Sequence, residues 1–175
     1  MREELTVVGI DPGKKGALAV INGNRSIDIY PMPLVGKGRA AELDMAVVLN
    51  IISDADMVVI EKVHAMPKQG VVSMFSFGLI YGQLLGLARC IGKPIINPTP
   101  QQWKGVVLKS YNKKDKSSSI KYCKFVYPKV DLKRTQRSFK DDDNFADALC
   151  LADYGFMRYK DLVTDRRNYG IQETE

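Results

Sequence analysis

The chain has 175 residues, of which 45% are apolar and 26% are charged, and its formal net charge is +6. This length and composition predict one globular domain with a single core and exclude a disordered chain. The three cysteines, Cys90, Cys123 and Cys150, are odd in number and far apart, which excludes a disulfide framework or a zinc site and predicts a reducing cytoplasm.

Three strands are predicted at the start of the chain, over Leu5–Asp11, Ala17–Ile21 and Ser26–Tyr30. The first contains a β-branched run, and the residues Asn22-Gly23-Asn24 between the other two are a hairpin signal. An amphipathic helix over Ala41–Ile52 follows. The run MVVIE over Met57–Glu61 is apolar up to its last residue, which is typical of a strand buried on both faces.

The most apolar stretch, Phe75–Ile91, is short for a membrane span and contains Gln83 and Arg89. We therefore predict a buried helix over Ser76–Ile91 and no membrane contact. One face of this helix carries a glycine at every fourth position: Gly78, Gly82 and Gly86. Because glycine lowers helix stability, this spacing indicates a close approach either to the sheet or to a partner helix.

The second half of the chain is predicted to add a strand over Lys93–Asn97 and helices over Lys116–Val126 and Asn144–Tyr159. Together the elements describe a mixed α/β sheet of five strands flanked by helices. No internal repeat or long linker divides the chain. We therefore predict one domain over residues 1–160, followed by a polar tail over residues 161–175.

Positive charge is concentrated in the segment Pro100–Lys140, which has 12 Lys and Arg but only Asp115 and Asp131. Its balance is +10, whereas the rest of the chain has a balance of −4. A basic segment beside an acidic remainder indicates a surface that binds phosphates and a centre that holds cations. A solvated basic loop without a ligand is the alternative.

Three carboxylates lie in apolar surroundings, where such groups are uncommon. Asp11 and Glu61 each end a predicted strand, and Asp147 lies in the apolar run FADALCLADYG, with Asp143 one turn before it on the same helix face. Carboxylates that converge repel each other unless cations lie between them, and oxygen ligands without His or Cys favour Mg²⁺ or Mn²⁺. The four residues therefore predict a site for two Mg²⁺ ions, a pair that can hydrolyse phosphodiesters.

Each carboxylate also has a purely structural interpretation. Asp11 can cap the turn at Pro12-Gly13, and Glu61 can pair with a basic residue at the sheet edge. The run Asp142-Asp143-Asn144 can form a helix N-terminus. The ordered set of carboxylates favours the metal site over these separate explanations.

The segments GIDPGKKGALAV, VVIEKV and DNFADALCLADYG occur in the order and spacing of RuvC-type Holliday junction resolvases. SMFSFGLIYGQLLGLA and PTPQQWKGVVLK also resemble that family, particularly its bacteriophage branch. The resemblance covers about Val7–Tyr159. It implies a ribonuclease H-like fold, a homodimer, and a divalent metal bound by four acidic residues that makes paired nicks across a four-way DNA junction.

The resemblance assigns three metal ligands to Asp11, Glu61 and Asp147. In many family members two acids lie three residues apart on the last helix, and that position here is Asn144. Asp143 matches the bacteriophage relatives and is preferred as the fourth ligand, with Asp142 as a weaker candidate.

Two lysines match basic family residues near the scissile phosphate: Lys104, which follows Trp103, and Lys116. Either could neutralise charge that develops in the transition state, and ordinary backbone contacts or solvation remain the alternative. Some members carry an aromatic wedge in the loop after the second acid, where this chain has His64 and Met66.

The resemblance thus implies a metal-dependent endodeoxyribonuclease that acts on branched DNA and takes no small-molecule substrate, in the cytoplasm of a bacterium or a phage-infected cell. Other ribonuclease H-like substrates, such as RNA–DNA hybrids, flaps or RNA precursors, remain alternatives, as does a DNA-binding module without catalysis. An actin-like ATPase is disfavoured because that fold needs two such domains, for which the chain is too short.

Overall fold

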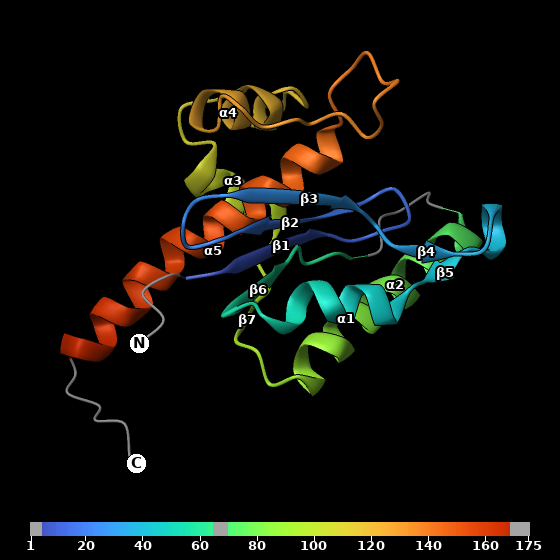
Figure 1. Ribbon diagram of the computed structural model, residues 1–175, viewed down its shortest axis with the longest axis horizontal. Coiled ribbons are helices and arrows are strands. Elements are labelled where there is room, and N and C mark those ends of the chain that lie inside the picture. Colours follow the sequence, from blue (N-terminus) through green and yellow to red (C-terminus); the bar gives the residue numbers. More distant parts are fainter. Residues whose placement is uncertain (1–4, 65–69, 169–175) are drawn as a thin grey trace.

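The computed structural model describes residues 5–64 and 70–168, except for the side chains of residues 39 and 160–168. Five strands form one mixed sheet in the order β3-β2-β1-β6-β7 (Figure 1). β1 is antiparallel to β2, and β2 to β3, whereas β6 is parallel to β1 and β7 to β6. The strands are β1 Val7–Asp11, β2 Ala17–Ile21, β3 Ile27–Pro31, β6 Met57–Ile60 and β7 Ile95–Ile96. This architecture confirms the predicted fold class.

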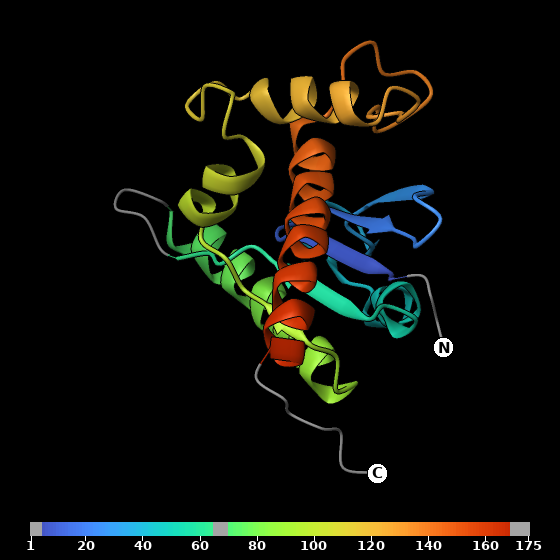
Figure 2. The same ribbon diagram turned by 90° about the vertical axis from the view of Figure 1, so that its left-hand side faces the viewer.

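The helices cover both faces of the sheet (Figures 1 and 2). One face carries α1 Met45–Ser53 and α2 Val71–Cys90, and the other carries α3 Pro100–Val107, α4 Ser118–Val126 and α5 Asp143–Asn168. A small hairpin of β4 Leu34–Val35 and β5 Glu42–Leu43, with the 3₁₀ helix η1 Gly38–Ala40 between its strands, connects β3 to α1.

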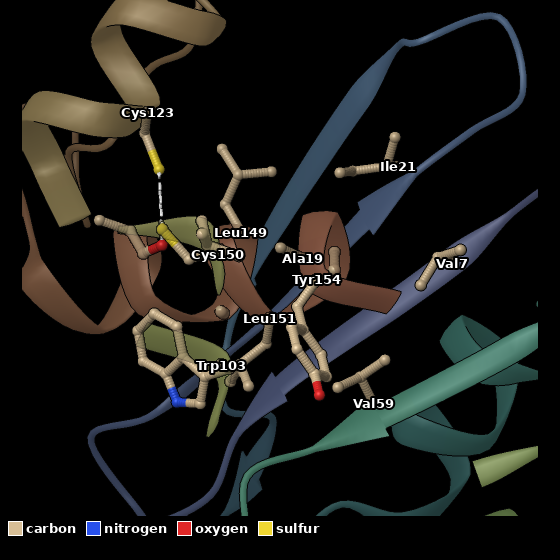
Figure 3. Close-up of a cluster of buried hydrophobic side chains, with 14 of the residues drawn as sticks. Val7, Ala19, Ile21, Val59, Trp103, Cys123, Leu149, Cys150, Leu151 and Tyr154 are labelled. Carbon is tan, nitrogen blue, oxygen red and sulfur yellow. Dashed lines mark hydrogen bonds between the residues drawn. The ribbon is translucent and has the colours of Figure 1, made fainter. Parts of the chain in front are cut away.

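The alternation of side chains along the strands produces two apolar cores, one on each face. Val7, Ala19 and Val59 face α5, whereas Val8, Leu18 and Val58 face α1 and α2. Figure 3 shows the α5 side of the sheet, where Leu149, Cys150, Leu151 and Tyr154 pack beside Trp103 of α3. Strands buried on both faces explain the nearly continuous apolar runs in β1, β2 and β6.

Close packing of α5 on β1 depends on Gly9. A Cβ atom at this position would lie 2.2 Å from the backbone nitrogen of Ala152 and 2.3 Å from the carbonyl oxygen of Ala148. No side chain fits there, so the glycine allows the helix backbone to approach the strand. The first turns of α5 are thereby held beside the end of β1.

The helix predicted over Ser76–Ile91 is present as α2, but the prediction that it is buried is wrong. Of the 20 residues of α2, only Ile80, Leu84 and Ala88 are buried, and they lie on one side of the helix. Val71 is 84% exposed and Phe75 is 74% exposed. The high apolar content of α2 therefore does not reflect burial on all sides, because the described part of the chain covers only the side that faces the sheet.

The glycine spacing of α2 had two predicted explanations, a close approach to the sheet or to a partner helix. The structure excludes the approach to the sheet. A Cβ atom at Gly78, Gly82 or Gly86 would meet nothing within 4 Å. By length and composition, α2 is also the one helix among the described residues that could cross a membrane. Its buried side packs in the same core as β1 and β6, so we interpret it as a helix of the globular domain.

Several predicted boundaries differ from the structure. The first helix begins at Met45 and not at Ala41, because Asp44 caps it by accepting a hydrogen bond from the N–H of Val47. The last helix continues to Asn168, beyond the predicted domain boundary at residue 160. Residues 161–168 of the predicted tail are therefore helical, and residues 169–175 lie outside the described part of the chain.

The prediction missed α3. Its start carries a clear signal: Pro100 occupies the first turn, and Thr99 and Gln102 form a reciprocal capping box.

Candidate active site

The two carboxylates that end strands lie at the same edge of the sheet. Asp11 is the last residue of β1, and Glu61 directly follows β6 and donates its backbone N–H to the carbonyl of Ile10 at 3.1 Å. Because β1 and β6 are parallel neighbours, their carboxyl ends bring Asp11 and Glu61 together. The turn after Asp11 is tight, since a Cβ atom at Gly16 would lie 2.0 Å from the carbonyl oxygen of Asp11.

The other two predicted carboxylates come from the start of α5. Asp143 begins the helix and is exposed, and Asp147 lies one turn later and is partly buried. The hydroxyl of Ser119, on α4, donates a hydrogen bond to Asp147. Because Gly9 lets α5 pack against β1, these carboxylates lie within electrostatic reach of the end of that strand.

The charges of the four carboxylates act on one another, and in this electrostatic sense they form one cluster. Burial raises the pKa of Asp11 well above its usual value, and the negative charges of Glu61, Asp147 and Asp143 raise it further. Burial also raises the pKa of Glu61, and the negative charge of Asp147 adds to this rise. Burial likewise raises the pKa of Asp147, and the negative charge of Asp143 adds to it. Partly buried carboxylates that resist ionisation together are expected where a cation is to be bound.

Lys104 is the positive charge of this cluster. It lowers the pKa of Asp11, Glu61 and Asp147, although burial and mutual repulsion outweigh it. Its ammonium lies 5.0 Å from the centre of the Trp103 ring. Lys104 is therefore near all three carboxylates, as a residue that neutralises phosphate charge would have to be.

Lys116 is exposed and lies farther out. It lines a pocket of about 260 Å³ together with Lys104, Ser119, Asp143 and Asp147. The structure thus brings both predicted lysines to the same pocket. Only Lys104 acts on the pKa values of the buried carboxylates.

A second, larger hollow of about 840 Å³ is lined by Asp11 itself. It is lined by the turn after Asp11, by the first turns of α2, and by Asn144. Asp143 and Asn144, two of the three candidates for the fourth ligand, line different hollows: Asp143 shares one with Asp147, and Asn144 shares one with Asp11.

Asp142, the weaker candidate, has structural partners. Its carboxylate accepts hydrogen bonds from the backbone N–H groups of Asn144, at 2.9 Å, and Phe145, at 3.4 Å, in the manner of a helix N-cap. It also forms an ion pair with Arg134. Burial raises the pKa of Asp142, but Arg134 and the hydrogen bonds from Asn144 outweigh it and lower the pKa. Asp142 therefore caps the start of α5 and holds Arg134.

The chemistry of the cluster fits a hard divalent cation. Its donors are carboxylate oxygens, and neither sulfur nor imidazole takes part, which suits Mg²⁺ or Mn²⁺ better than zinc. As they are placed, however, no three Asp, Glu, His or Cys side chains in the described ranges lie close enough together to hold a metal ion. The four-residue ligand set therefore stays a prediction.

The predicted wedge position lies partly outside the described residues. His64 is exposed just before the undescribed segment 65–69, which contains Met66. The prediction for this loop stays untested.

Sequence reasoning missed three residues that position the site. Trp103 donates its indole Nε1–H to Glu61 at 2.8 Å, Ser119 donates to Asp147, and Arg134 joins Asp142 to the carbonyl of Lys15 in the turn after Asp11. Trp103 is the single tryptophan and adjoins Lys104, which is a weak signal. Ser119 and Arg134 have no signal in the sequence, because they act across 28 and 119 residues.

Two other buried groups near the site are structural. Asp153 accepts hydrogen bonds from the hydroxyls of Tyr122 and Tyr127, and the carboxylate and burial raise the pKa of both tyrosines. The Sγ atoms of Cys123 and Cys150 lie 3.7 Å apart as free thiols (Figure 3). Both contacts join α4 to α5.

No protein-family model matches the sequence, and no curated protein matches it. Among solved structures, Thermus thermophilus RuvC aligns with a TM-score of 0.57 and 19% identity, over 89% of this chain and 96% of that chain. T. thermophilus RuvC in complex with a Holliday junction substrate gives a TM-score of 0.58 and 17% identity, over 89% and 95%. The yeast mitochondrial Holliday junction resolvase Ydc2 gives 0.51 and 16%, over 93% and 82%.

The chain has the ribonuclease H-like fold of RuvC and Ydc2. The resemblance to RuvC-type resolvases is therefore confirmed at the level of the fold. A relation to the bacteriophage branch stays a prediction.

Proposed function

We propose that this protein is a metal-dependent endodeoxyribonuclease that resolves four-way DNA junctions by hydrolysing paired phosphodiester bonds. The observation that carries the proposal is the carboxylate cluster of Asp11, Glu61, Asp143 and Asp147, with Lys104 among them. The fold gives further support, because a protein of this fold, T. thermophilus RuvC, is known in complex with a Holliday junction substrate.

In this mechanism the oxygen of a water molecule attacks the phosphorus, and the bond from phosphorus to the 3′ oxygen breaks. The products carry a 5′ phosphate and a 3′ hydroxyl. Bound Mg²⁺ would activate the water and stabilise the departing oxygen. Asp11, Glu61, Asp143 and Asp147 would hold the metal, and Lys104 would neutralise charge on the phosphate.

The protein's own hydrogen bonds would keep these groups in place. Trp103 orients Glu61, and Ser119 orients Asp147. Groups fixed in this way lose little freedom when the substrate binds, which is how positioning contributes to catalysis. The basic segment Pro100–Lys140 would bind backbone phosphates, so DNA affinity should fall steeply with salt concentration.

We also propose that the active protein is a homodimer joined through α2. This helix exposes Val72, Phe75 and Leu79 on the side that faces away from the sheet. Gly78, Gly82 and Gly86 have open space on the same side, where a second helix backbone could approach closely. A symmetric pair of sites would make the two nicks in one junction.

The proposed activity is tested by cleavage of a labelled synthetic four-way junction in Mg²⁺, beside a linear duplex, a flap and an RNA–DNA hybrid. Wild type is compared with Glu61→Gln, and with Glu42→Gln as a matched change at an exposed glutamate of β5. We expect symmetric nicks in the junction that Glu61→Gln abolishes and Glu42→Gln preserves. Equal cleavage of flaps or hybrids would broaden the substrate class, and cleavage of no substrate in Mg²⁺ or Mn²⁺ would overturn the proposal.

A further inference from the structure

The connection between α4 and α5 contains a loop that is closed at its base. The backbone N–H of Asp142 donates to the carbonyl of Leu132 at 2.8 Å, and Leu132 is fully buried. Arg134 binds the carboxylate of Asp142 at the same place. Inside the loop, Ser138 donates its N–H to the carbonyl of Thr135 at 2.9 Å, which forms a turn. The loop is therefore held by its own contacts, and it projects from the body of the domain (Figures 1 and 2).

This loop presents an apolar ring to solvent. Phe139 is 101% exposed, the largest value among the exposed large hydrophobic residues in the described part of the chain. Its neighbours in the loop, Arg137, Ser138 and Lys140, are polar. No described side chain covers Phe139, so both faces of its ring are free to contact a ligand.

The charges around Phe139 are positive. Arg137 and Lys140 are exposed and form no ion pair with any described residue. The two acidic residues that follow are paired, Asp141 with Lys124 and Asp142 with Arg134. The loop therefore offers one exposed ring between two cations, in the most basic segment of the chain.

The loop also adjoins the proposed active site. It leads directly into Asp143, and a hollow of about 540 Å³ is lined by Arg137, Phe139, Lys140 and Asp143. Asp143 lines both this hollow and the pocket that contains Asp147. The aromatic ring and the two cations therefore lie next to one of the four proposed metal ligands.

On the basis of the proposed function, we propose that this loop contacts DNA beside the cleaved bond. Phe139 stacks on a base that is left without a stacking neighbour at the branch point, while Arg137 and Lys140 bind the flanking phosphates. Aromatic rings beside basic residues are the usual means of holding unstacked bases, and stacking needs no particular base sequence. A protein partner would more commonly meet a contiguous apolar patch.

The test compares binding to a four-way junction and to a linear duplex of the same sequence, by fluorescence anisotropy. Glu61→Gln serves as the background, so that binding is measured without cleavage. We expect Phe139→Ala to weaken junction binding by about fivefold or more and to leave duplex binding nearly unchanged. Phe139→Trp should restore junction binding. Phe125→Ala is the matched control, because Phe125 of α4 is also strongly exposed, at 79%, in the same basic segment.

Equal junction affinity for Phe139→Ala and its Glu61→Gln parent would overturn the proposal, as would equal weakening of junction and duplex binding. A change in sedimentation coefficient with Phe139→Ala would instead assign the ring to a contact between protein chains. The proposed function is judged separately, by junction cleavage with the wild-type chain, in which Glu61 is intact. If that chain cleaves the junction and Phe139→Ala binds it normally, only the loop proposal fails. If the chain binds no junction, both fail.

Discussion

The indole nitrogen of Trp103 donates a 2.8 Å hydrogen bond to a carboxylate oxygen of Glu61, and the indole itself is fully buried. The orientation of a strand-end carboxylate is thus set by a helix that begins 39 positions later in the chain. The same hydrogen bond lowers the pKa of Glu61 against the raising effect of burial.

The Trp103 contact predicts a specific effect of Trp103→Phe. Loss of the donor raises the pKa of Glu61 further, so the acidic limb of the pH–rate profile should move to higher pH. We expect junction cleavage near pH 7 to fall about tenfold, equivalent to about 1.4 kcal/mol of transition-state stabilisation, and to recover in part at higher pH. A uniform loss at all pH values would show that the indole acts only through core packing.

The raised pKa values of Asp11, Glu61 and Asp147 predict how stability depends on pH in the presence of a chelator. A group whose pKa is higher in the folded than in the unfolded state stabilises the fold below its unfolded pKa, about 4 for a carboxyl group. This contribution is lost as pH rises through the folded value. We therefore expect the Tm of the chelated protein to fall between pH 5 and pH 8, and Mg²⁺ to raise it more at pH 8 than at pH 5.

Asp11→Asn is the control for this pH dependence. Because it removes one of the repelling charges, it should raise the Tm of the chelated protein at pH 8. The expected rise is roughly 2–4 °C for each 1 kcal/mol by which the free energy of unfolding increases. It should also reduce the stabilisation by Mg²⁺. The lowered pKa of Asp142 does not interfere, since its contribution is lost only at lower pH. An unchanged Mg²⁺ effect would place the metal away from Asp11.

Arg134 connects the start of α5 to the turn after Asp11, through Asp142 and the carbonyl of Lys15. Asp142→Asn keeps an N-cap acceptor and removes the charge, so it isolates the ion pair from the cap. A double-mutant cycle with Arg134→Ala, measured by urea unfolding, should give a coupling of about 1–2 kcal/mol, because both side chains are partly buried. Coupling near zero would mean that the two residues contribute independently.

The proposed dimer predicts that a charge on the exposed side of α2 separates the subunits. Gly82→Glu is suitable because the position is open in the single chain and glutamate favours helix by about 0.5–1 kcal/mol over glycine. We expect sedimentation to show a monomer with an unchanged or higher Tm, whereas Asn50→Glu on the exposed side of α1 should remain dimeric. Identical sedimentation of Gly82→Glu and wild type would exclude this interface.

The sequence by itself determined the strands and the acids that end them. β-branched runs and the Asn22-Gly23-Asn24 turn act over neighbouring residues, so the antiparallel β1-β2-β3 unit could be predicted closely. Asp11 and Glu61 could be selected because each follows an apolar run at the end of a strand. Asp143 and Asp147 share a helix face by their spacing alone.

Tertiary structure decided what these carboxylates contact and which surfaces remain open. The hydrogen bonds from Trp103 to Glu61 and from Ser119 to Asp147 join residues 42 and 28 positions apart, so no local pattern encodes them. The sequence also did not predict that α2 and Phe139 are exposed to solvent. Apolar composition predicts that a side chain gains free energy on leaving water, but only the packed chain determines whether a neighbour is present to cover it.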